Sequence, residues 1–475
     1  MDISPSYVLS IIIIIAYTIT IISVIFIVIT ENRNPVRSLA WVTVLLCLPV
    51  IGLILYVFFG RSIKNKALIA KMSKRKLLYS EAIKQVDFSK LPLSSDSLQQ
   101  IRLGHSLMGA VYYPGNKVDI YTDGSEMFGK LKEDIANAKK SINLQFYIFE
   151  DDNLGQEIAQ LLIDKAKQGI PVRVIYAHVG SFRVSKKFYR RMRDAGVEIY
   201  PFFKVTFPEF AARVNWRNHR KVTVIDGRIG YIGGMNIADR YLGSGDKTWR
   251  DNHIRIEGQS VLGLFHSFAA DWCFMGLPAF DEEFARWDCD VADMAGIQII
   301  GSGPIGQWHN IALMVQKAIG SARKRIYIQT PYFLPTSGLL AALQTAALSK
   351  VDVRIMIQRT PDSAMLRLAS ASYISQCLHA GIKIYYYEPG MLHSKIVIID
   401  DEMVTTGSTN FDFRSFEYNF ECNAFIYSRE INRQMRDIFL DDMKACTRVR
   451  ATAWRHRPFI QKLKETLVRL LSPVL

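Results

Sequence analysis

A histidine, a lysine and an aspartate recur in the same order at two places in the chain. Short apolar runs follow each lysine, and a Gly-x-x-Asn group follows each aspartate at the same distance. One constant offset superimposes the two stretches, which read His219-Arg-Lys221-Val-Thr-Val-Ile-Asp226 with Gly233 and Asn236, and His393-Ser-Lys395-Ile-Val-Ile-Ile-Asp400 with Gly407, Ser408 and Asn410. So many matched positions in one register argue against a chance repeat.

These residue types suit chemistry on a phosphodiester. A neutral imidazole can attack phosphorus, a lysine ammonium can neutralise the non-bridging oxygens, and asparagine amides can add hydrogen bonds. With two sets, one imidazole can attack while the other moves the proton, which is typically worth about 10²- to 10⁴-fold in rate. Asp251 and Glu421 follow the two motifs, and either carboxylate could hold an imidazole in the required tautomer.

Two plainer interpretations compete with this one. A single copy of the pattern could be a buried strand histidine beside a surface lysine. A metal site is disfavoured, because neither histidine has the i, i+4 histidine or cysteine cluster of a zinc site and a protonated lysine cannot be a ligand. The matched pair therefore favours catalysis, and no metal or other cofactor is expected.

Apolar strands alternate with amphipathic helices around both motifs. In the first half the expected strands are 118–122, 142–149, 172–177 and 198–203, with helices at 125–140, 154–168 and 186–195. In the second half the expected strands are 297–300, 326–333, 353–358 and 383–388, with helices at 311–323, 337–349 and 363–380. This order predicts a duplicated α/β domain with a mixed sheet flanked by helices.

The motifs themselves are predicted to open buried strands. The segments 221–225 and 395–399 are almost entirely apolar, as a central strand should be. Residues two apart on a strand point to the same face, so we expect each histidine and its lysine to share one face.

The composition indicates an anionic partner. The chain has 475 residues, enough for two or three domains, and carries a formal net charge of +15. That charge alone cannot distinguish nucleic acid from an acidic membrane surface. The six cysteines include no CxxC pair, so neither a zinc site nor a disulfide framework is indicated.

Two long uncharged runs near the N-terminus favour a membrane. Residues 7–30 and 39–59 contain 24 and 21 residues without a charge, and each can cross about 30 Å of hydrocarbon. A cleaved signal peptide is disfavoured, because the first run has no basic region before it and a second run follows at once. We therefore predict a transmembrane helical hairpin with a short loop at 31–38.

The flanking charges predict the orientation of this hairpin. Basic residues crowd the segment 61–76, which has no acidic residue, whereas the hairpin loop holds only Arg33 and Arg37. The large C-terminal part should then be cytoplasmic. The basic run could also contact anionic headgroups at roughly 1 kcal/mol per cation, with a solvated charged helix as the alternative.

The motif pair resembles the two HKD motifs of the phospholipase D superfamily, and the whole chain resembles the bacterial cardiolipin synthases within it. Further matching segments support the second statement, namely Arg33-Asn-Pro35, Ala40-Trp41, Leu48-Pro49, Tyr56 to Gly60, Gln329-Thr-Pro-Tyr-Phe333, Arg414-Ser415, Asn419-Phe-Glu421 and Arg469 to Leu475. Ala177 departs from the pattern, because many relatives carry an aspartate there.

The resemblance implies two phospholipase D-like domains in pseudo-two-fold pairing. It also implies transfer of a phosphatidyl group between two phosphatidylglycerol molecules through a phosphatidyl-histidine, with His219 as nucleophile and His393 as acid and base, or the reverse. The implied catalytic set is His219, Lys221, Asp226, His393, Lys395 and Asp400. The implied phosphate-binding or supporting set is Gly233, Asn236, Asp251, Ser408, Asn410 and Glu421.

The predicted organisation has six segments. They are the two spans (1–60), a basic linker or cap (61–115), the first domain (116–258), a connector (259–295), the second domain (296–450) and an amphipathic C-terminal segment (451–475). We expect a multi-pass protein of the bacterial cell membrane that acts on anionic lipids. A homo-oligomer is compatible with the sequence.

Three alternatives remain open at this level. A hydrolytic phospholipase D would use the same motifs, a nuclease of the superfamily would suit the charge but not the hairpin, and a non-enzymatic scaffold would not need both complete motifs. Two further stretches are ambiguous as well: 201–214 could border the site at the membrane or pack in the core, and 459–471 could be an interfacial helix or pack on the domain.

Overall fold

The computed structural model describes residues 5–30, 35–48, 51–53, 56, 93–204, 216–243, 249–278, 280, 295–361 and 363–470. The chain divides into two compact units. The described part of the first unit is the N-terminal region up to residue 56. The second unit, called the main body below, contains the described residues from 93 onward.

Two helices form the N-terminal unit. Helix α1 (Pro5–Thr30) has 26 residues and contacts α2 (Pro35–Cys47). Their contact includes buried Ile21 and Leu45, and the Trp41 ring lies edge-on to Tyr56 at 5.4 Å. Many other isoleucines of α1, such as Ile14 and Ile22, are exposed.

Among the described residues, no helix qualifies by length and apolarity as a membrane span. The basic run at 61–76, the hairpin loop up to residue 34 and parts of the predicted second span lie outside the described residues. The transmembrane hairpin and its orientation therefore stay predictions.

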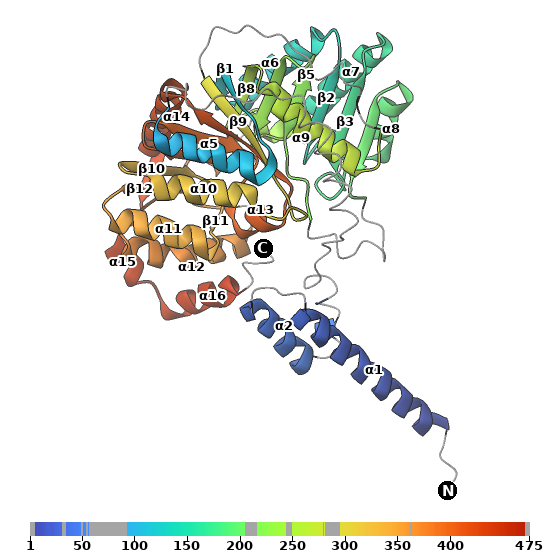
Figure 1. Cartoon of the computed structure of the whole chain (residues 1–475), viewed down its shortest axis with the longest axis vertical. Helices are drawn as coiled ribbons and strands as arrows, with labels where there is room; N and C mark the ends of the chain where they lie inside the picture. The colour runs from blue at the N-terminus through green and yellow to red at the C-terminus, as the bar shows by residue number, and fades with distance from the viewer. Residues whose placement is uncertain are drawn as a thin grey trace. The chain divides into compact units, whose positions relative to one another are not determined.

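One sheet of fifteen strands forms the centre of the main body (Figure 1). The first half contributes β1 (Tyr112–Tyr121), β2 (Ile142–Phe146), β3 (Val172–Ala177), β4 (Glu198–Phe202), β5 (Val222–Ile225), β6 (Ile229–Gly233) and β8 (His253–Gly258). The second half contributes β9 (Ala295–Ser302), β10 (Arg325–Gln329), β12 (Asp352–Gln358), β13 (Lys383–Tyr387), β15 (Ile396–Ile399), β16 (Met403–Gly407), β18 (Glu421–Tyr427) and β19 (Cys446–Arg448).

The two halves of this sheet have the same strand order. Outward from β1 the order is β8, β6, β5, β2, β3 and β4, and outward from β9 it is β18, β16, β15, β10, β12 and β13, followed by β19. Strands β2, β3 and β4 are parallel, as are β10, β12 and β13, and the other neighbours are antiparallel. The predicted duplicated α/β fold with a mixed sheet is confirmed.

Helices cover the sheet in matching positions. They are α6 (Gly124–Ala136), α7 (Asn153–Lys167), α8 (Lys186–Asp194) and α9 (Val261–Phe274) in the first half, and α10 (Asn310–Ser321), α11 (Ser337–Leu348), α12 (Ala364–His379) and α14 (Arg429–Asp442) in the second. Side chains cap many of their N-termini, since Asp123, Asp152, Thr336 and Ser428 each accept a backbone N–H there. Most predicted boundaries lie within a few residues of these.

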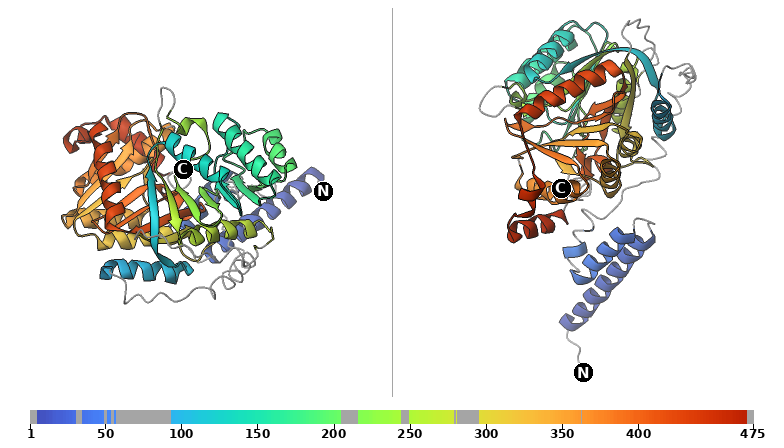
Figure 2. Two further views of the ribbon diagram at one scale, coloured as in Figure 1. Left: turned by 90° about the horizontal axis from the view of Figure 1, so that it is seen from above. Right: turned by 90° about the vertical axis from the view of Figure 1, so that its left-hand side faces the viewer.

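Two elements differ from the prediction. The expected strand 326–333 ends at Gln329, because Pro331 cannot donate to a ladder, and Phe333–Leu334 forms the separate short strand β11. Helix α5 (Ser95–Met108) lies in the segment predicted only as a linker or cap. It packs beside α10 and β9, as both Figure 1 and Figure 2 show.

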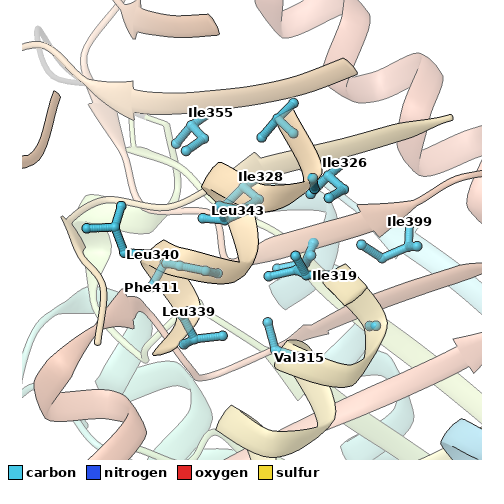
Figure 3. Packing of buried hydrophobic residues seen from close by; sticks show 14 of the residues in the cluster. Val315, Ile319, Ile326, Ile328, Leu339, Leu340, Leu343, Ile355, Ile399 and Phe411 are labelled. Atoms are coloured by element: carbon cyan, nitrogen blue, oxygen red, sulfur yellow. The ribbon is translucent and has the colours of Figure 1, made fainter. Parts of the chain in front are cut away.

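Three apolar cores hold the main body together. One lies under α6, α7 and α8, and a second, drawn in Figure 3, joins α10 and α11 to the second half of the sheet through residues such as Ile328 and Leu343. The third combines both halves, with Val224 and Ile232 from the first and Ile398 and Val404 from the second. Strand β6 accordingly contacts β16 and β18. The motif strands β5 and β15 both lie in this shared core, which fixes one motif relative to the other.

Candidate active site

The first motif enters its strand alongside a segment of the second half. The His219 N–H donates to the Phe420 carbonyl at 2.9 Å, and the Phe420 N–H donates to the Arg217 carbonyl at 2.8 Å. His219 and Lys221 lie just before β5 rather than within it, which differs from the predicted strand start. This backbone pairing places Glu421 next to His219.

The second motif has the reciprocal arrangement. Strand β14 (Met391–Leu392) pairs in parallel with β7 (Trp249–Arg250) of the first half. The His393 N–H then donates to the Arg250 carbonyl at 2.7 Å. Asp251 follows Arg250 and comes to lie next to His393.

Each imidazole is therefore bound by a carboxylate from the opposite half. His219 Nδ1 is 3.1 Å from Glu421 Oε1 and 3.2 Å from Oε2, and His393 Nδ1 is 2.7 Å from Asp251 Oδ2. A carboxylate accepts a proton from Nδ1, so this contact favours the tautomer whose Nε2 carries the lone pair. Both acids were candidates from the sequence, but only the fold pairs each with the histidine that is more distant along the chain.

Both carboxylates are buried and supported by further hydrogen bonds. Ser408 Oγ donates to Glu421, and Asn419 Nδ2 donates to it at 3.1 Å. The Asn252 N–H donates to Asp251 at 2.7 Å. Burial alone would raise the pKa of Glu421 and of Asp251, but the neighbouring imidazoles and lysines hold the pKa of each below its ordinary value. Both acids are therefore ionised at neutral pH.

Ser408 and its counterpart Gly234 make the two acid sites unequal. The Ser408 side chain contacts Glu421, whereas a Cβ at Gly234 would lie 2.2 Å from Asp251 Oδ1. Glycine is thus required where the aspartate approaches the backbone, and serine supports the longer glutamate.

Two buried lysines complete the centre. Lys221 Nζ donates to the His219 carbonyl at 2.7 Å, and Lys395 Nζ lies 3.0 Å from His393 Nδ1 and 3.9 Å from Asp251 Oδ2. Burial lowers the pKa of both lysines, and the charge of Lys395 lowers that of Lys221 further. Like charges held close together repel each other, so an anion bound near both lysines is favoured.

Both imidazoles are neutral at neutral pH. Burial lowers the pKa of His219 to about 4 and that of His393 to about 3, although the adjacent carboxylates act in the opposite direction. The charge of each motif's lysine contributes to the lowering at the other motif's histidine. The two sets therefore border one site.

Aromatic and arginine side chains flank this centre and were not predicted as site residues. The Tyr147 ring lies edge-on to His219 at 5.1 Å, and the Trp249 ring lies 5.3 Å from His393. Arg217 donates to the Tyr147 hydroxyl at 3.3 Å, and burial together with the Arg217 charge lowers the pKa of Arg414 to about 10. Of these residues, Arg414 alone belonged to a segment that the sequence analysis matched to the family, Arg414-Ser415.

The predicted asparagine and glycine positions mainly support the backbone. Asn236 Oδ1 accepts the Ile148 N–H at 3.1 Å, and its Nδ2 donates to the Tyr241 hydroxyl at 2.7 Å. A Cβ at Gly233 would lie 2.6 Å from the His253 ring, so only glycine fits there. Asn410 is buried, and its Oδ1 has no hydrogen-bond partner among the described residues.

The structure does not bring Asp226 and Asp400 to the imidazoles, in contrast to their predicted place in the catalytic set. Each lies at the far end of its motif strand, about 16 Å along the chain from the motif lysine at 3.3 Å per residue. Both have a positive φ, 52° and 48°, and turn back to accept backbone N–H groups of the loop before β2 or β10. The shortest of these bonds join Lys140 N to Asp226 and Lys324 N to Asp400, each at 2.7 Å.

Within the described ranges, no cluster of three or more His, Cys, Asp and Glu side chains is arranged to hold a metal ion.

We predict that Asp226→Ala lowers stability more than it affects chemistry. The substitution leaves three amide donors without their acceptor, which should reduce the free energy of unfolding by about 1–3 kcal/mol. Thermal unfolding should show a lower Tm than in the wild type, while Asp194→Ala, an exposed aspartate in α8, should not. Loss of catalysis at an unchanged Tm would instead place Asp226 in the reaction.

Comparison with known proteins assigns the family. The family model described as "Cardiolipin synthase, PLD-like domain" matches residues 131–272 and 315–443, and the model "Phospholipase_D-nuclease N-terminal" matches residues 15–61. The chain is 37% identical over 464 residues to the cardiolipin synthase of Geobacillus sp. (strain WCH70), covering 96% of this chain and 92% of that protein. It is 37% identical over 473 residues to the major cardiolipin synthase ClsA of Bacillus subtilis (strain 168), covering 97% and 98%.

Among solved structures, the phosphatidylserine synthase of Haemophilus influenzae has the same fold. The TM-score is 0.62 at 15% identity, with 79% of this chain and all of that chain covered. The duplicated sheet, the paired motifs and the near full-length match agree, and the chain belongs to the cardiolipin synthases of the phospholipase D superfamily.

Proposed function

We propose that the protein joins two phosphatidylglycerol molecules to give cardiolipin and glycerol through a phosphatidyl-histidine. The observation that carries this proposal is the pair of motif histidines, each bound at Nδ1 by a carboxylate of the other half and each in contact with a buried lysine of its own motif. The names of the relatives support the product.

In the first step, His219 Nε2 attacks the phosphorus of one phosphatidylglycerol. A phosphorus–nitrogen bond forms, the bond from phosphorus to the glycerol oxygen breaks, and His393 gives that oxygen its proton. His393 can carry the proton because a bound phosphodiester anion offsets the lysine charges, which raises the pKa of the imidazole in the complex. Lys221 and Lys395 stabilise the negative charge that builds up on the phosphoryl oxygens.

In the second step, the terminal hydroxyl of another phosphatidylglycerol attacks the phosphatidyl-histidine. His393 takes the proton of this hydroxyl, the phosphorus–nitrogen bond breaks, and cardiolipin forms while His219 returns to its neutral state. We assign the attack to His219 from the resemblance of the first motif to those of the superfamily. In both motifs a carboxylate of the other half contacts the imidazole at Nδ1.

An anionic second lipid suits the charges around the site better than water does. Arg217 and Arg414 add positive charge beside Tyr147 and His219, and the charge of one lowers the pKa of the other. The phosphate of an acceptor phosphatidylglycerol would relieve this repulsion. A hydrolase would gain nothing from a second anion site, so this cluster favours transfer over hydrolysis.

The membrane location is part of the same proposal. The substrate is a bilayer lipid, and the uncharged segments 7–30 and 39–59 would anchor the main body on the cytoplasmic side of the cell membrane.

We predict that the purified protein, incubated with phosphatidylglycerol vesicles, releases one glycerol for each cardiolipin formed. His219→Ala and His393→Ala should each abolish the product, because each removes a group that bonds to phosphorus or moves the proton. His105→Ala, an exposed histidine on α5, is the matched control and should retain full activity. Formation of phosphatidic acid without cardiolipin would identify a hydrolase and refute the transfer.

We predict that kcat/KM falls on the acid side only at unusually low pH. This parameter reports the free enzyme, whose His219 must be neutral to attack, and burial lowers its pKa to about 4. Activity should therefore persist as the pH falls below 6, and decline only as the pH approaches the lowered pKa. A limb near the ordinary histidine pKa of about 6.5 would contradict the burial of this imidazole.

A further inference from the structure

Helix α16 (Phe459–Arg469) packs on the main body with its apolar side facing outward. Figure 1 shows it beside α12, which it contacts. Its large apolar residues are nevertheless exposed, with 75% of Phe459, 66% of Ile460 and 56% of Leu467 accessible. Leu463 and Leu470 are exposed as well. An amphipathic helix on a globular domain normally buries this side.

The five residues form one continuous surface, called the α16 apolar face below. At about 100° per residue, Phe459, Leu470, Leu463, Leu467 and Ile460 occupy an arc of roughly 100° on the helix. Exposed Lys464 borders this arc on one side, and exposed Lys462 lies beyond its other edge.

The opposite side of α16 faces the main body and carries polar residues together with Val468, which packs against the apolar core of the second half. Glu465 is only 3% exposed and forms a 2.5 Å ion pair with Arg457. The Arg469 guanidinium lies 4.3 Å from the centre of the Tyr373 ring of α12. A buried ion pair left without one partner is strongly destabilising, so these contacts hold α16 with its apolar face outward.

The surroundings of the face are basic. Between residues 443 and 470 the chain has eight lysines and arginines, and its single acid is the buried Glu465. The neighbouring helix α12 contains no acidic residue and exposes Arg367 and Met365. An exposed apolar face bordered by lysines complements an anionic lipid surface, where acyl chains cover the leucines and headgroups pair with the ammonium groups.

We propose that the α16 apolar face inserts into the interface of an anionic bilayer and gives the main body its own contact with the membrane. The choice of an anionic lipid rests on the proposed function. The orientation of the helix rests on the contacts of Glu465, Val468 and Arg469 and not on the proposed function. Such a contact would keep the site at the surface from which its lipid substrates come.

The test places a photoreactive benzoylphenylalanine at position 463 or, as a control, at position 348. Leu348 is a 65% exposed leucine on α11, without the α16 lysines around it. The full-length protein is reconstituted in vesicles of phosphatidylglycerol and phosphatidylcholine and irradiated, and the adducts are identified by mass spectrometry. We expect a phospholipid adduct at position 463, enriched in phosphatidylglycerol, and about tenfold less at position 348.

Two other outcomes of this experiment would overturn the proposal. Crosslinking of position 463 to a second protein chain would mean that the face joins two copies, and equal or absent lipid adducts at the two positions would mean that it does not enter the bilayer. Crosslinking needs no turnover, so the same experiment on the His219→Ala protein should give the same adducts. Failure of the proposed chemistry and failure of this inference are thereby distinguished.

The proposal also predicts a specific loss of activity on bilayers. The double substitution Leu463→Glu with Leu467→Glu should lower turnover on vesicles severalfold and leave turnover on detergent-dispersed phosphatidylglycerol unchanged, because the site itself is intact. Leu348→Glu should change neither. Equal vesicle activity of the double variant and the wild type would contradict a role for the contact.

Discussion

The carboxylates of Glu421 and Asp251 are buried, and each is hydrogen-bonded to an imidazole of the other half of the chain. A buried charged group left without one of its hydrogen-bond partners typically costs about 1–3 kcal/mol or more. Donors from its own half satisfy each acid only in part, so the two halves must dock before either acid has all its partners. The shared apolar core and the backbone bonds at Phe420 and Arg250 make that docking specific.

The same constraint organises the charge of the site. Two lysines and two imidazoles are buried within the reach of each other's charge, and burial lowers the pKa of all four. The lysine charges therefore lie in an unfavourable environment, which a phosphodiester anion would relieve. In the proposed reaction, binding and catalysis use one arrangement, because the groups that would attract the phosphate would also stabilise the charge that develops on it. Asp226 and Asp400 contribute at a distance, since they fix the far ends of the two motif strands.

Much of this could be predicted from the sequence. The duplication, the mixed sheet and most helices follow from repeated patterns of apolar residues, and the histidines and lysines follow from one matched spacing. The pairing of acids could not be predicted, because Asp251 is close to His219 in sequence and yet contacts His393. Tyr147 and Trp249 carry no repeated signal, and Asp226 was expected in the catalytic set although it lies at the far end of its strand. For α16, the pattern predicts an apolar face, but the direction of this face depends on contacts of Glu465, Val468 and Arg469 that only the fold provides.

The central claim is that one site uses a motif histidine as the group that bonds to phosphorus, with the other histidine moving the proton. It is tested most directly by mixing the protein with phosphatidylglycerol and stopping the reaction within one turnover in alkaline denaturant, which preserves a phosphorus–nitrogen bond. Mass spectrometry of the digested protein should find a phosphatidyl group on the peptide that contains His219. An adduct on any residue outside the two motifs, or cardiolipin formation with no adduct on either His219 or His393, would contradict the account.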